Sequence, residues 1–252
     1  MTAAWIRIKW LSFILGALQM RESLDLSAYL VVGPENTLGR PVREIVGAAV
    51  AEGFTCVQIR SKTASARELI ELARDASDVI GAQGKQGTVA LLVDDRLDVV
   101  LAARDMGIRV DGIHVGQSDI PVAVCRKYLG EDAVVGLSAR TNELLDYVRN
   151  VDVSDIDYFG AGPLHETATK LDCGRDSHGN VITRSLRELT ELAACSPRPV
   201  VVGGGVKARD LPALAATGVD GFFVVSAVAG AEDPAGASRE LVGIWQAEKA
   251  KK

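Results

Sequence analysis

The sequence lacks the patterns that define several classes of protein. Its four cysteines (Cys56, Cys125, Cys173 and Cys195) form no C-x-x-C pair, and Cys56 and Cys125 stand in apolar contexts typical of buried free thiols. It has no excess of basic residues, because 28 Lys and Arg are mixed with 33 Asp and Glu for a net charge of −5. This argues against partners such as nucleic acid or a membrane surface. We expect a cytoplasmic protein in which any anionic ligand depends on a local positive site or a metal.

The apolar run at residues 5–18, WIRIKWLSFILGAL, is too short to span a bilayer and lacks a clear small-x-small cleavage site. Arg7 and Lys9 near its start give it a profile like that of a signal peptide. A leader, a helix that closes the bottom of a barrel, and a disordered extension all remain open, and the last two are favoured because nothing downstream looks secreted. We therefore assign residues 1–25 to an N-terminal extension and residues 26–248 to one domain.

From residue 28 onward, short runs rich in Val and Ile alternate with longer segments of helical period, as a parallel sheet with crossover helices requires. The expected strands are Tyr29–Val32, Cys56–Arg60, Val89–Val93, Gly112–Val115, Val134–Leu137, Tyr158–Ala161, Val200–Val202 and Gly221–Val225. The expected helices are Val42–Glu52, Ala66–Ile80, Leu97–Met106, Pro121–Leu129, Asn142–Val151, Leu186–Ala194, Ala208–Thr217 and Pro234–Glu248. Glycines 53, 107, 130 and 218 follow the expected helices at positions where a residue in the left-handed conformation commonly ends a helix. Eight such units predict an α/β fold, a closed (β/α)₈ TIM barrel, whose chemistry lies at the C-terminal ends of the strands.

Polar residues on the second strand stand out. Gln58, Arg60 and Lys62 alternate with Cys56 and therefore share one face of the strand. Burying them without partners would cost several kcal/mol. A position at the open top of the barrel, around an anionic ligand, removes that cost; a merely exposed strand end is the alternative.

Carboxylates follow the third and fourth strands. Asp94 and Asp95 precede one expected helix and Asp119 precedes another, so each alone is read most simply as a helix cap. Together, at the tops of adjacent strands and opposite Arg60 and Lys62, they suit Mg²⁺, which takes one or two protein carboxylates and completes its shell with water and phosphate oxygens. His114 is interpreted as a structural residue that lines the barrel.

A phosphate site is predicted on the other side of the barrel. The seventh strand leads into Gly203-Gly204-Gly205, the eighth ends at Val225-Ser226, and loops at these positions commonly bind phosphate through backbone N–H groups. The sixth strand leads into Thr167-Ala168-Thr169-Lys170, which offers hydroxyls and an ammonium; a solvated polar loop is the simpler alternative. Ser138 closes the fifth strand, again at the top.

With these residues assembled, the chain resembles the thiamine-phosphate synthase (thiamine phosphate pyrophosphorylase) family along nearly all of residues 28–237. The matching pieces, in order, are QIRSK (58–62), DDR (94–96), DGIHVGQSD (111–119), GLSA (136–139), GAGP (160–163), TATK (167–170), GGV (204–206) and VVSA (224–227). Their joint order and spacing are far more specific than any single piece.

The resemblance implies an alkyl transferase that joins 4-amino-2-methyl-5-(diphosphooxymethyl)pyrimidine to a thiazole phosphate or its carboxylate form, giving thiamine phosphate and pyrophosphate. It assigns the pyrimidine diphosphate to Gln58, Ile59, Arg60, Ser61, Lys62, Asp94, Ser138 and Lys170. It assigns the thiazole phosphate to Thr167, Ala168, Thr169, Gly204, Gly205, Val225 and Ser226, and Mg²⁺ to Asp95 and Asp119. Arg60, Lys62, Ser138 and Lys170 are the expected catalytic residues, and no general base is needed because no proton leaves.

The chain departs from the family pattern at two places. The family usually has Asn at the position of Asp94, so we hypothesise that Asp94 joins the metal shell, with Mg²⁺, Arg96 or Lys62 offsetting its charge. The loop at 164–166 and 171–180 is atypical in carrying His165, Glu166, Cys173 and His178; Cys173 and His178 are too sparse for a zinc site.

Two other functions stay open. A related barrel that tautomerises the thiazole carboxylate phosphate would need a general base, and a non-catalytic phosphate-binding barrel would bind without turnover. The carboxylate pair and the Q-x-R-x-K strand favour metal and diphosphate over both. The sequence leaves the oligomeric state open, including a homo-oligomer.

Overall fold

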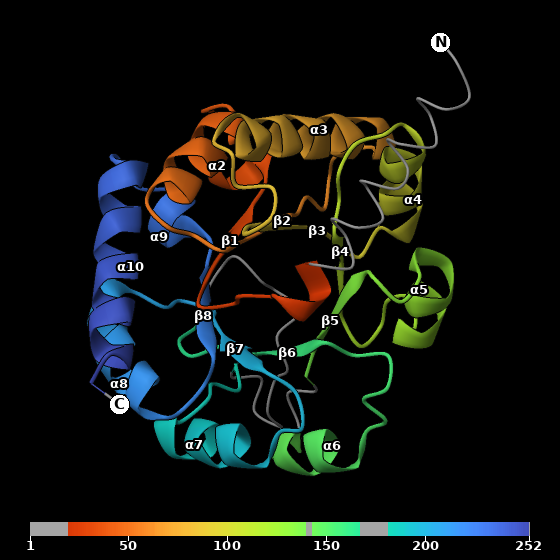
Figure 1. Cartoon of the computed structure of the whole chain (residues 1–252). Coiled ribbons are helices and arrows are strands. Elements are labelled where there is room, and N and C mark those ends of the chain that lie inside the picture. The colour runs from red at the N-terminus through yellow and green to blue at the C-terminus, as the bar shows by residue number, and fades with distance from the viewer. Residues whose placement is uncertain (1–19, 140–142, 167–180, 252) are drawn as a thin grey trace.

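The computed structural model describes residues 20–139, 143–166 and 181–251, and it is a closed barrel of eight parallel strands (Figure 1). The strands are β1 (Ala28–Val32), β2 (Cys56–Ile59), β3 (Ala90–Asp94), β4 (Gly112–Val115), β5 (Val134–Ser138), β6 (Tyr158–Ala161), β7 (Val200–Val202) and β8 (Gly221–Val224). Each pairs with the next, and β8 pairs back to β1, with Leu30 opposite Val224. The predicted (β/α)₈ fold is confirmed.

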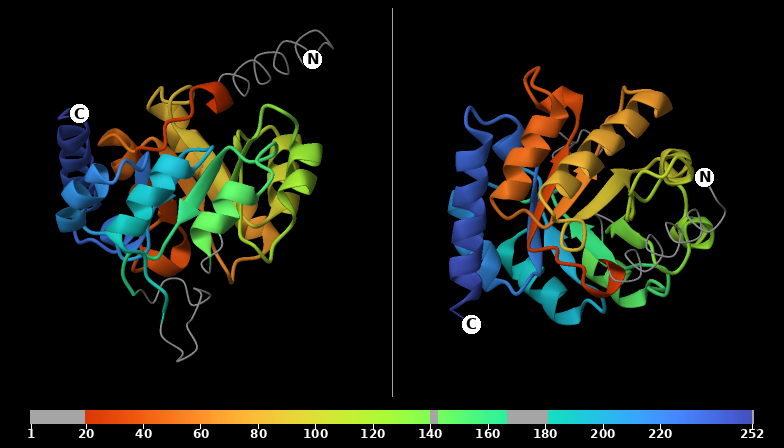
Figure 2. Two further views of the ribbon diagram at one scale, coloured as in Figure 1. Left: turned by 90° about the horizontal axis from the view of Figure 1, so that it is seen from below. Right: turned by 45° about the horizontal axis from the view of Figure 1, so that its top comes forward.

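Helices surround the barrel (Figures 1 and 2). They are α2 (Val42–Ala51), α3 (Ala66–Ala82), α4 (Leu97–Asp105), α5 (Val122–Leu129), α6 (Leu144–Asn150), α7 (Leu186–Cys195), α8 (Leu211–Ala216), α9 (Ser226–Ala229) and α10 (Pro234–Lys249), with short 3₁₀ helices η1 (Pro34–Asn36) and η2 (Ala208–Asp210). The expected helix at 208–217 is thus divided between η2 and α8, and η1 and α9 were not predicted. The four cap glycines, 53, 107, 130 and 218, all have the positive φ expected of them.

Strand alternation produces two separate cores. On β2, Val57 and Ile59 pack outward with the helices, whereas Cys56 joins Tyr29, Tyr158 and other inward side chains in a cluster inside the barrel. Gln58 continues the inward face and is 4% exposed. The alternation therefore carries polar groups along the inside of β2 towards the open end, as predicted.

The described start of the chain packs against the opposite end of the barrel. Met20 is 1% exposed and belongs to the inner cluster, and Arg21 Nε lies 2.8 Å from Asp157 Oδ1, just before β6. Residues 20–25, which we had assigned to an extension, thus contact the barrel; the domain boundary at residue 25 stays a prediction, and residues 1–19 lie outside the described ranges. Among the described residues, no helix is long and apolar enough to cross a membrane.

Candidate active site

A cavity of about 990 Å³ opens at the C-terminal ends of the strands. Most of the predicted site residues that the structure describes line it: Gln58, Arg60, Lys62, Asp94, Asp95, Asp119, Ser138, Gly204, Gly205, Val225 and Ser226. Two do not bring their side chains into it, since Ile59 packs in the outer core and Ser61 binds Glu35 in the loop after β2. Thr167, Ala168, Thr169, Lys170, Cys173 and His178 lie outside the described residues. The volume is that of a site for small organic ligands.

Two cations from β2 and its loop face two carboxylates from β3 on one side of the cavity. Arg60 Nε lies 3.0 Å from Asp94 Oδ2, and Lys62 Nζ lies 3.8 Å from the same oxygen while it also contacts Asp95 Oδ2. We call this side, with Gln58, Arg60, Lys62, Asp94, Asp95 and Asp119, the charged wall. Arg60 and Lys62 thus offset Asp94 and Asp95, whereas Asp119 forms no ion pair with the described residues, so the wall has more carboxylates than cations.

Arg96 has no part in this arrangement. It forms a two-bond pair with Asp98, at 2.8 Å from Nε and 2.6 Å from Nη2, two residues along the chain. Of the three cations considered for offsetting the charge of Asp94, Arg96 pairs with its local partner, Lys62 lies beside Asp94 as considered, and Mg²⁺ stays a prediction; Arg60 is an additional partner.

The three carboxyl groups of the charged wall compete for negative charge. Burial, followed by the charge of Asp95, raises the pKa of Asp94 to about 7, although Arg60 and Lys62 oppose the rise. Burial and then Asp95 also raise the pKa of Asp119. For Asp95, burial is outweighed by hydrogen bonds with Lys62 and Asp119, and its pKa is lowered. Negative charge on all three carboxyl groups at once is therefore unfavourable unless a further cation approaches them.

The capping roles considered for these carboxylates are wrong. Helix α4 begins after Arg96 and α5 after Pro121, and neither has a side-chain cap. Asp119 instead accepts a hydrogen bond from the Gly116 N–H at 2.8 Å, and Asp95 has a left-handed φ of 59°, uncommon outside glycine. Both geometries hold a carboxylate at the cavity.

This donor set fits Mg²⁺. The described residues contain no cluster of three or more His, Cys, Asp or Glu able to hold a metal, but Mg²⁺ needs only one or two protein carboxylates. The ammonium of Lys62 already contacts Asp95, which shows that the position accepts a cation. The Mg²⁺ assignment stays a prediction.

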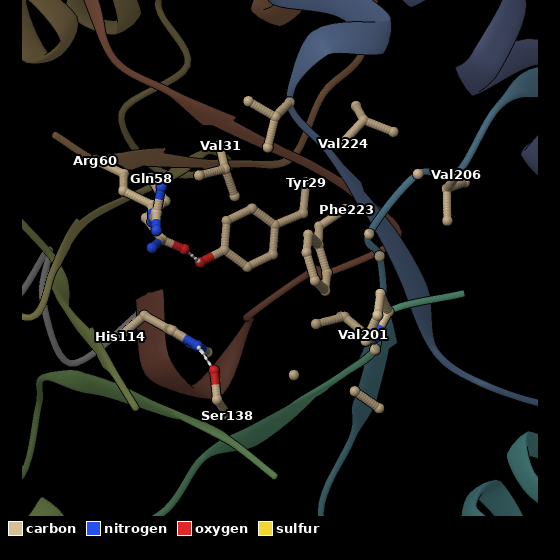
Figure 3. Close-up of a pocket in the computed structure, with 18 of the residues that line it drawn as sticks. Tyr29, Val31, Gln58, Arg60, His114, Ser138, Val201, Val206, Phe223 and Val224 are labelled. Atoms are coloured by element: carbon tan, nitrogen blue, oxygen red, sulfur yellow. Dashed lines mark hydrogen bonds between the residues drawn. The ribbon is translucent and has the colours of Figure 1, made fainter. Parts of the chain in front are cut away.

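A hydrogen-bonded chain of side chains crosses the floor of the cavity. Tyr29 Oη donates to Gln58 Oε1 at 2.5 Å and lies 2.8 Å from Tyr158 Oη, which lies 2.8 Å from His114 Nδ1; His114 Nε2 lies 3.0 Å from Ser138 Oγ. Figure 3 shows its two ends, with Tyr29 directed at Gln58 and His114 at Ser138. His114 lines the barrel as predicted. The roles of Tyr29 and Tyr158 were missed, because both read as strand residues; tyrosine at an inward position was the only available signal.

The opposite side of the cavity is built from backbone; we call Gly203, Gly204, Gly205, Val225 and Ser226 the glycine wall. A Cβ on Gly203 would lie 2.2 Å from the Phe223 ring, and one on Gly204 would lie 2.5 Å from Pro163 Cβ. The N–H groups of Leu164 and His165 donate to the carbonyls of Gly203 and Gly204 at 3.0 and 2.9 Å. These glycines are thus needed for packing between the loops after β6 and β7; phosphate binding there stays a prediction.

Comparison with known proteins agrees with this geometry. The family model described as Thiamine monophosphate synthase matches residues 28–228. Thiamine-phosphate synthase of Corynebacterium efficiens is 42% identical over 88% of this chain and 96% of its own length. Thiamine-phosphate synthase of Moorella thermoacetica is 37% identical over 84% of this chain and 92% of its own length.

Solved structures give the same result. Thiamine phosphate pyrophosphorylase from Pyrococcus furiosus is 27% identical with a TM-score of 0.72, over 91% of this chain and 98% of that one. A 3-hexulose-6-phosphate synthase, at 16% identity and a TM-score of 0.59, shares the fold alone. The chain belongs to the thiamine monophosphate synthase family.

Proposed function

We propose that this enzyme joins 4-amino-2-methyl-5-(diphosphooxymethyl)pyrimidine to 4-methyl-5-(2-phosphooxyethyl)thiazole or its carboxylate form, with release of pyrophosphate and, from the carboxylate form, also of CO₂. One observation carries the proposal for this chain: a single cavity has a charged wall at the ends of β2–β4 and a glycine wall at the ends of β7 and β8. Two anionic substrates need two separate anion sites that face a shared centre, and this arrangement can supply them. Family membership gives the reaction type.

The charged wall suits the departing diphosphate. Breaking the C–O bond of the pyrimidine methyl group moves negative charge onto the diphosphate, and the Arg60 guanidinium and Lys62 ammonium lie where they can stabilise it. Asp95 and Asp119 would hold Mg²⁺, which when bound supplies further neutralisation of the diphosphate. Lys170 is assigned to the same task by family likeness and lies outside the described residues.

The glycine wall suits the second substrate. Val225, Ser226 and Ala227, at the start of α9, line the cavity together with Gly205, and the first N–H groups of a helix have no intrahelical acceptor. A thiazole held there by its phosphate would present its ring nitrogen to the pyrimidine methyl carbon at high effective concentration. The new C–N bond forms as the C–O bond breaks, and no proton has to be removed.

An end-point assay for thiamine phosphate and pyrophosphate, from the two substrates with and without Mg²⁺, tests the proposal. Equimolar products that require Mg²⁺ are expected. Tautomerisation of the thiazole carboxylate phosphate without coupling would instead support the related tautomerase, and binding of both substrates without turnover would support a non-catalytic barrel.

We also propose that the enzyme works in the cytoplasm. The support is that Cys56, Cys125 and Cys195 are free thiols, two of them buried. Its partners on this proposal are small phosphorylated substrates, and a homo-oligomer remains open. Fractionation and light scattering would test location and assembly.

A further inference from the structure

The chain of hydrogen bonds across the cavity floor has a direction that can be read from its chemistry. It begins at Asp94, whose Oδ2 pairs with Arg60 at 3.0 Å and whose Oδ1 accepts from the Gln58 Nε2 amide. The reverse orientation of the Gln58 amide would place a carbonyl oxygen against a carboxylate. Gln58 therefore presents Oε1, which can only accept, to Tyr29.

Each following member has one proton to give. Tyr29 gives its proton to Gln58 at 2.5 Å, so its oxygen must accept from Tyr158. Tyr158 has then used its own proton and must accept from His114 Nδ1–H. A neutral His114 with its proton on Nδ1 has only an acceptor at Nε2, so it takes the proton of Ser138 Oγ, 3.0 Å away.

We propose that Tyr29, Tyr158 and His114 are positioning residues that fix the Ser138 hydroxyl as a hydrogen-bond acceptor facing the cavity. Its two lone pairs then recognise a substrate N–H donor, such as the exocyclic amine of an aminopyrimidine. A phosphate oxygen, which offers only lone pairs, is repelled there and belongs at Arg60 and Lys62 instead. This inference deepens the proposed function and rests on it for the identity of the amine.

The tautomer of His114 is a test that does not depend on activity. The full chain labelled with ¹⁵N-histidine contains three histidines, and long-range ¹H–¹⁵N spectra distinguish Nδ1–H, Nε2–H and doubly protonated rings. His114→Asn identifies the signals of interest. At about pH 8, where an ordinary imidazole is neutral, the ligand-free parent should show the Nδ1–H form.

Tyr29→Phe is the informative variant, because Tyr29 contacts Tyr158, which in turn contacts His114. Without Tyr29 as acceptor, Tyr158 gives its proton to His114 Nδ1, and the ring changes to the Nε2–H form. Tyr158→Phe should give the same change and serves if the first variant does not fold. Tyr128→Phe, a matched control on an exposed tyrosine, should leave the tautomer unchanged. An Nε2–H or doubly protonated His114 in the parent, or an unchanged tautomer in both variants, overturns the proposal.

A binding measurement tests the acceptor role of Ser138. By calorimetry, Ser138→Ala should weaken the diphosphate-free 4-amino-5-(hydroxymethyl)-2-methylpyrimidine about tenfold, the usual effect of one buried hydrogen bond, and leave inorganic pyrophosphate unchanged. Ser118→Ala, another serine that lines the cavity, is the control. Weaker pyrophosphate binding with unchanged pyrimidine binding would show that Ser138 is a phosphate donor and refute the acceptor role. If the parent binds neither probe, the proposed function fails, and the tautomer measurement still decides the direction of the chain.

Discussion

The two walls of the cavity are built by different means. On the charged wall, Arg60, Lys62, Asp94 and Asp95 hold one another by ion pairs, and the pKa values of the carboxyls depend on their neighbours. On the glycine wall, Gly203 and Gly204 hold the loops together because nothing larger fits. The first wall is set by charge and the second by shape. A ligand can therefore rearrange the charged wall, for example by replacing Lys62 at Asp95, whereas the glycine wall is fixed before binding.

The largest effect is expected from removing a carboxylate of the charged wall. Asp95→Ala or Asp119→Ala should reduce Mg²⁺-dependent turnover at least about a hundredfold, as loss of one electrostatic stabiliser does, and should raise the Mg²⁺ concentration needed. The fold should persist, since both residues lie at the cavity rather than in the core. Steady-state rates across a Mg²⁺ titration measure this.

Asp98→Ala is the matched control, because this carboxylate is exposed and pairs only with Arg96 among the ion pairs of the described chain. It should behave like the parent. Normal turnover and a normal Mg²⁺ response in both cavity variants would reject the metal assignment.

A smaller and more selective effect is expected from adding charge to the glycine wall. Ser226→Asp should weaken the thiazole phosphate about tenfold or more, since a carboxylate beside the backbone donors repels the phosphate, and should affect the pyrimidine diphosphate much less. Ser226→Ala keeps the backbone donors and should bind the thiazole phosphate nearly as well as the parent. Calorimetry with each substrate alone measures both. Equal losses for the two substrates in Ser226→Asp would show that the walls are not separate sites.

The fold was predictable because its signals are local. Buried parallel strands such as Val200–Val202 are short apolar runs, and Gly107 or Gly130 marks the end of a helix with a positive φ. Helix α9 was not predictable from period, since its four residues, Ser226–Ala229, complete barely one turn.

The site residues were predictable where a charged residue interrupts the apolar pattern of a strand. They were not predictable where only the packing of distant strands brings side chains together. Arg60, Asp95 and Asp119 stand out because charged residues at strand ends need a reason. Tyr29 and Tyr158 do not, because only the closed barrel brings hydroxyls from β1 and β6 within 2.8 Å. The choice among the cations considered for Asp94 was open for the same reason: sequence spacing could not show that Arg96 pairs with Asp98 while Arg60 pairs with Asp94 across strands.

Asp94 also makes a prediction about stability and pH in the metal-free protein. Its pKa is about 7 in the folded chain against an ordinary 3.8, so the folded state favours the protonated form. The parent is therefore destabilised as the pH rises from about 4 to about 7, whereas Asp94→Asn does not titrate. Thermal melts with chelator should show a Tm advantage of the variant that is near zero at low pH and grows by a few degrees towards neutral pH. Asp98→Asn should instead show a Tm disadvantage that grows as the pH rises, because Arg96 holds the pKa of Asp98 below its ordinary value. A constant Tm difference across pH would contradict this.

The smallest effect on turnover is expected from the same substitution with Mg²⁺ present. Asp94 accepts from Gln58 and pairs with Arg60, and an asparagine can keep the amide contact while it gives up the ion pair. If Asp94 joins the metal shell directly or through water, Asp94→Asn weakens Mg²⁺ binding but frees Arg60 and places an amide near the diphosphate. Turnover at saturating Mg²⁺ should then stay within about tenfold of the parent, or about 1.4 kcal/mol, with a higher Mg²⁺ requirement. Rates measured across a Mg²⁺ series decide whether Asp94 acts in the metal shell or through its negative charge opposite Arg60. A variant that is inactive at every Mg²⁺ concentration would mean that the negative charge itself, opposite Arg60, is essential to the charged wall.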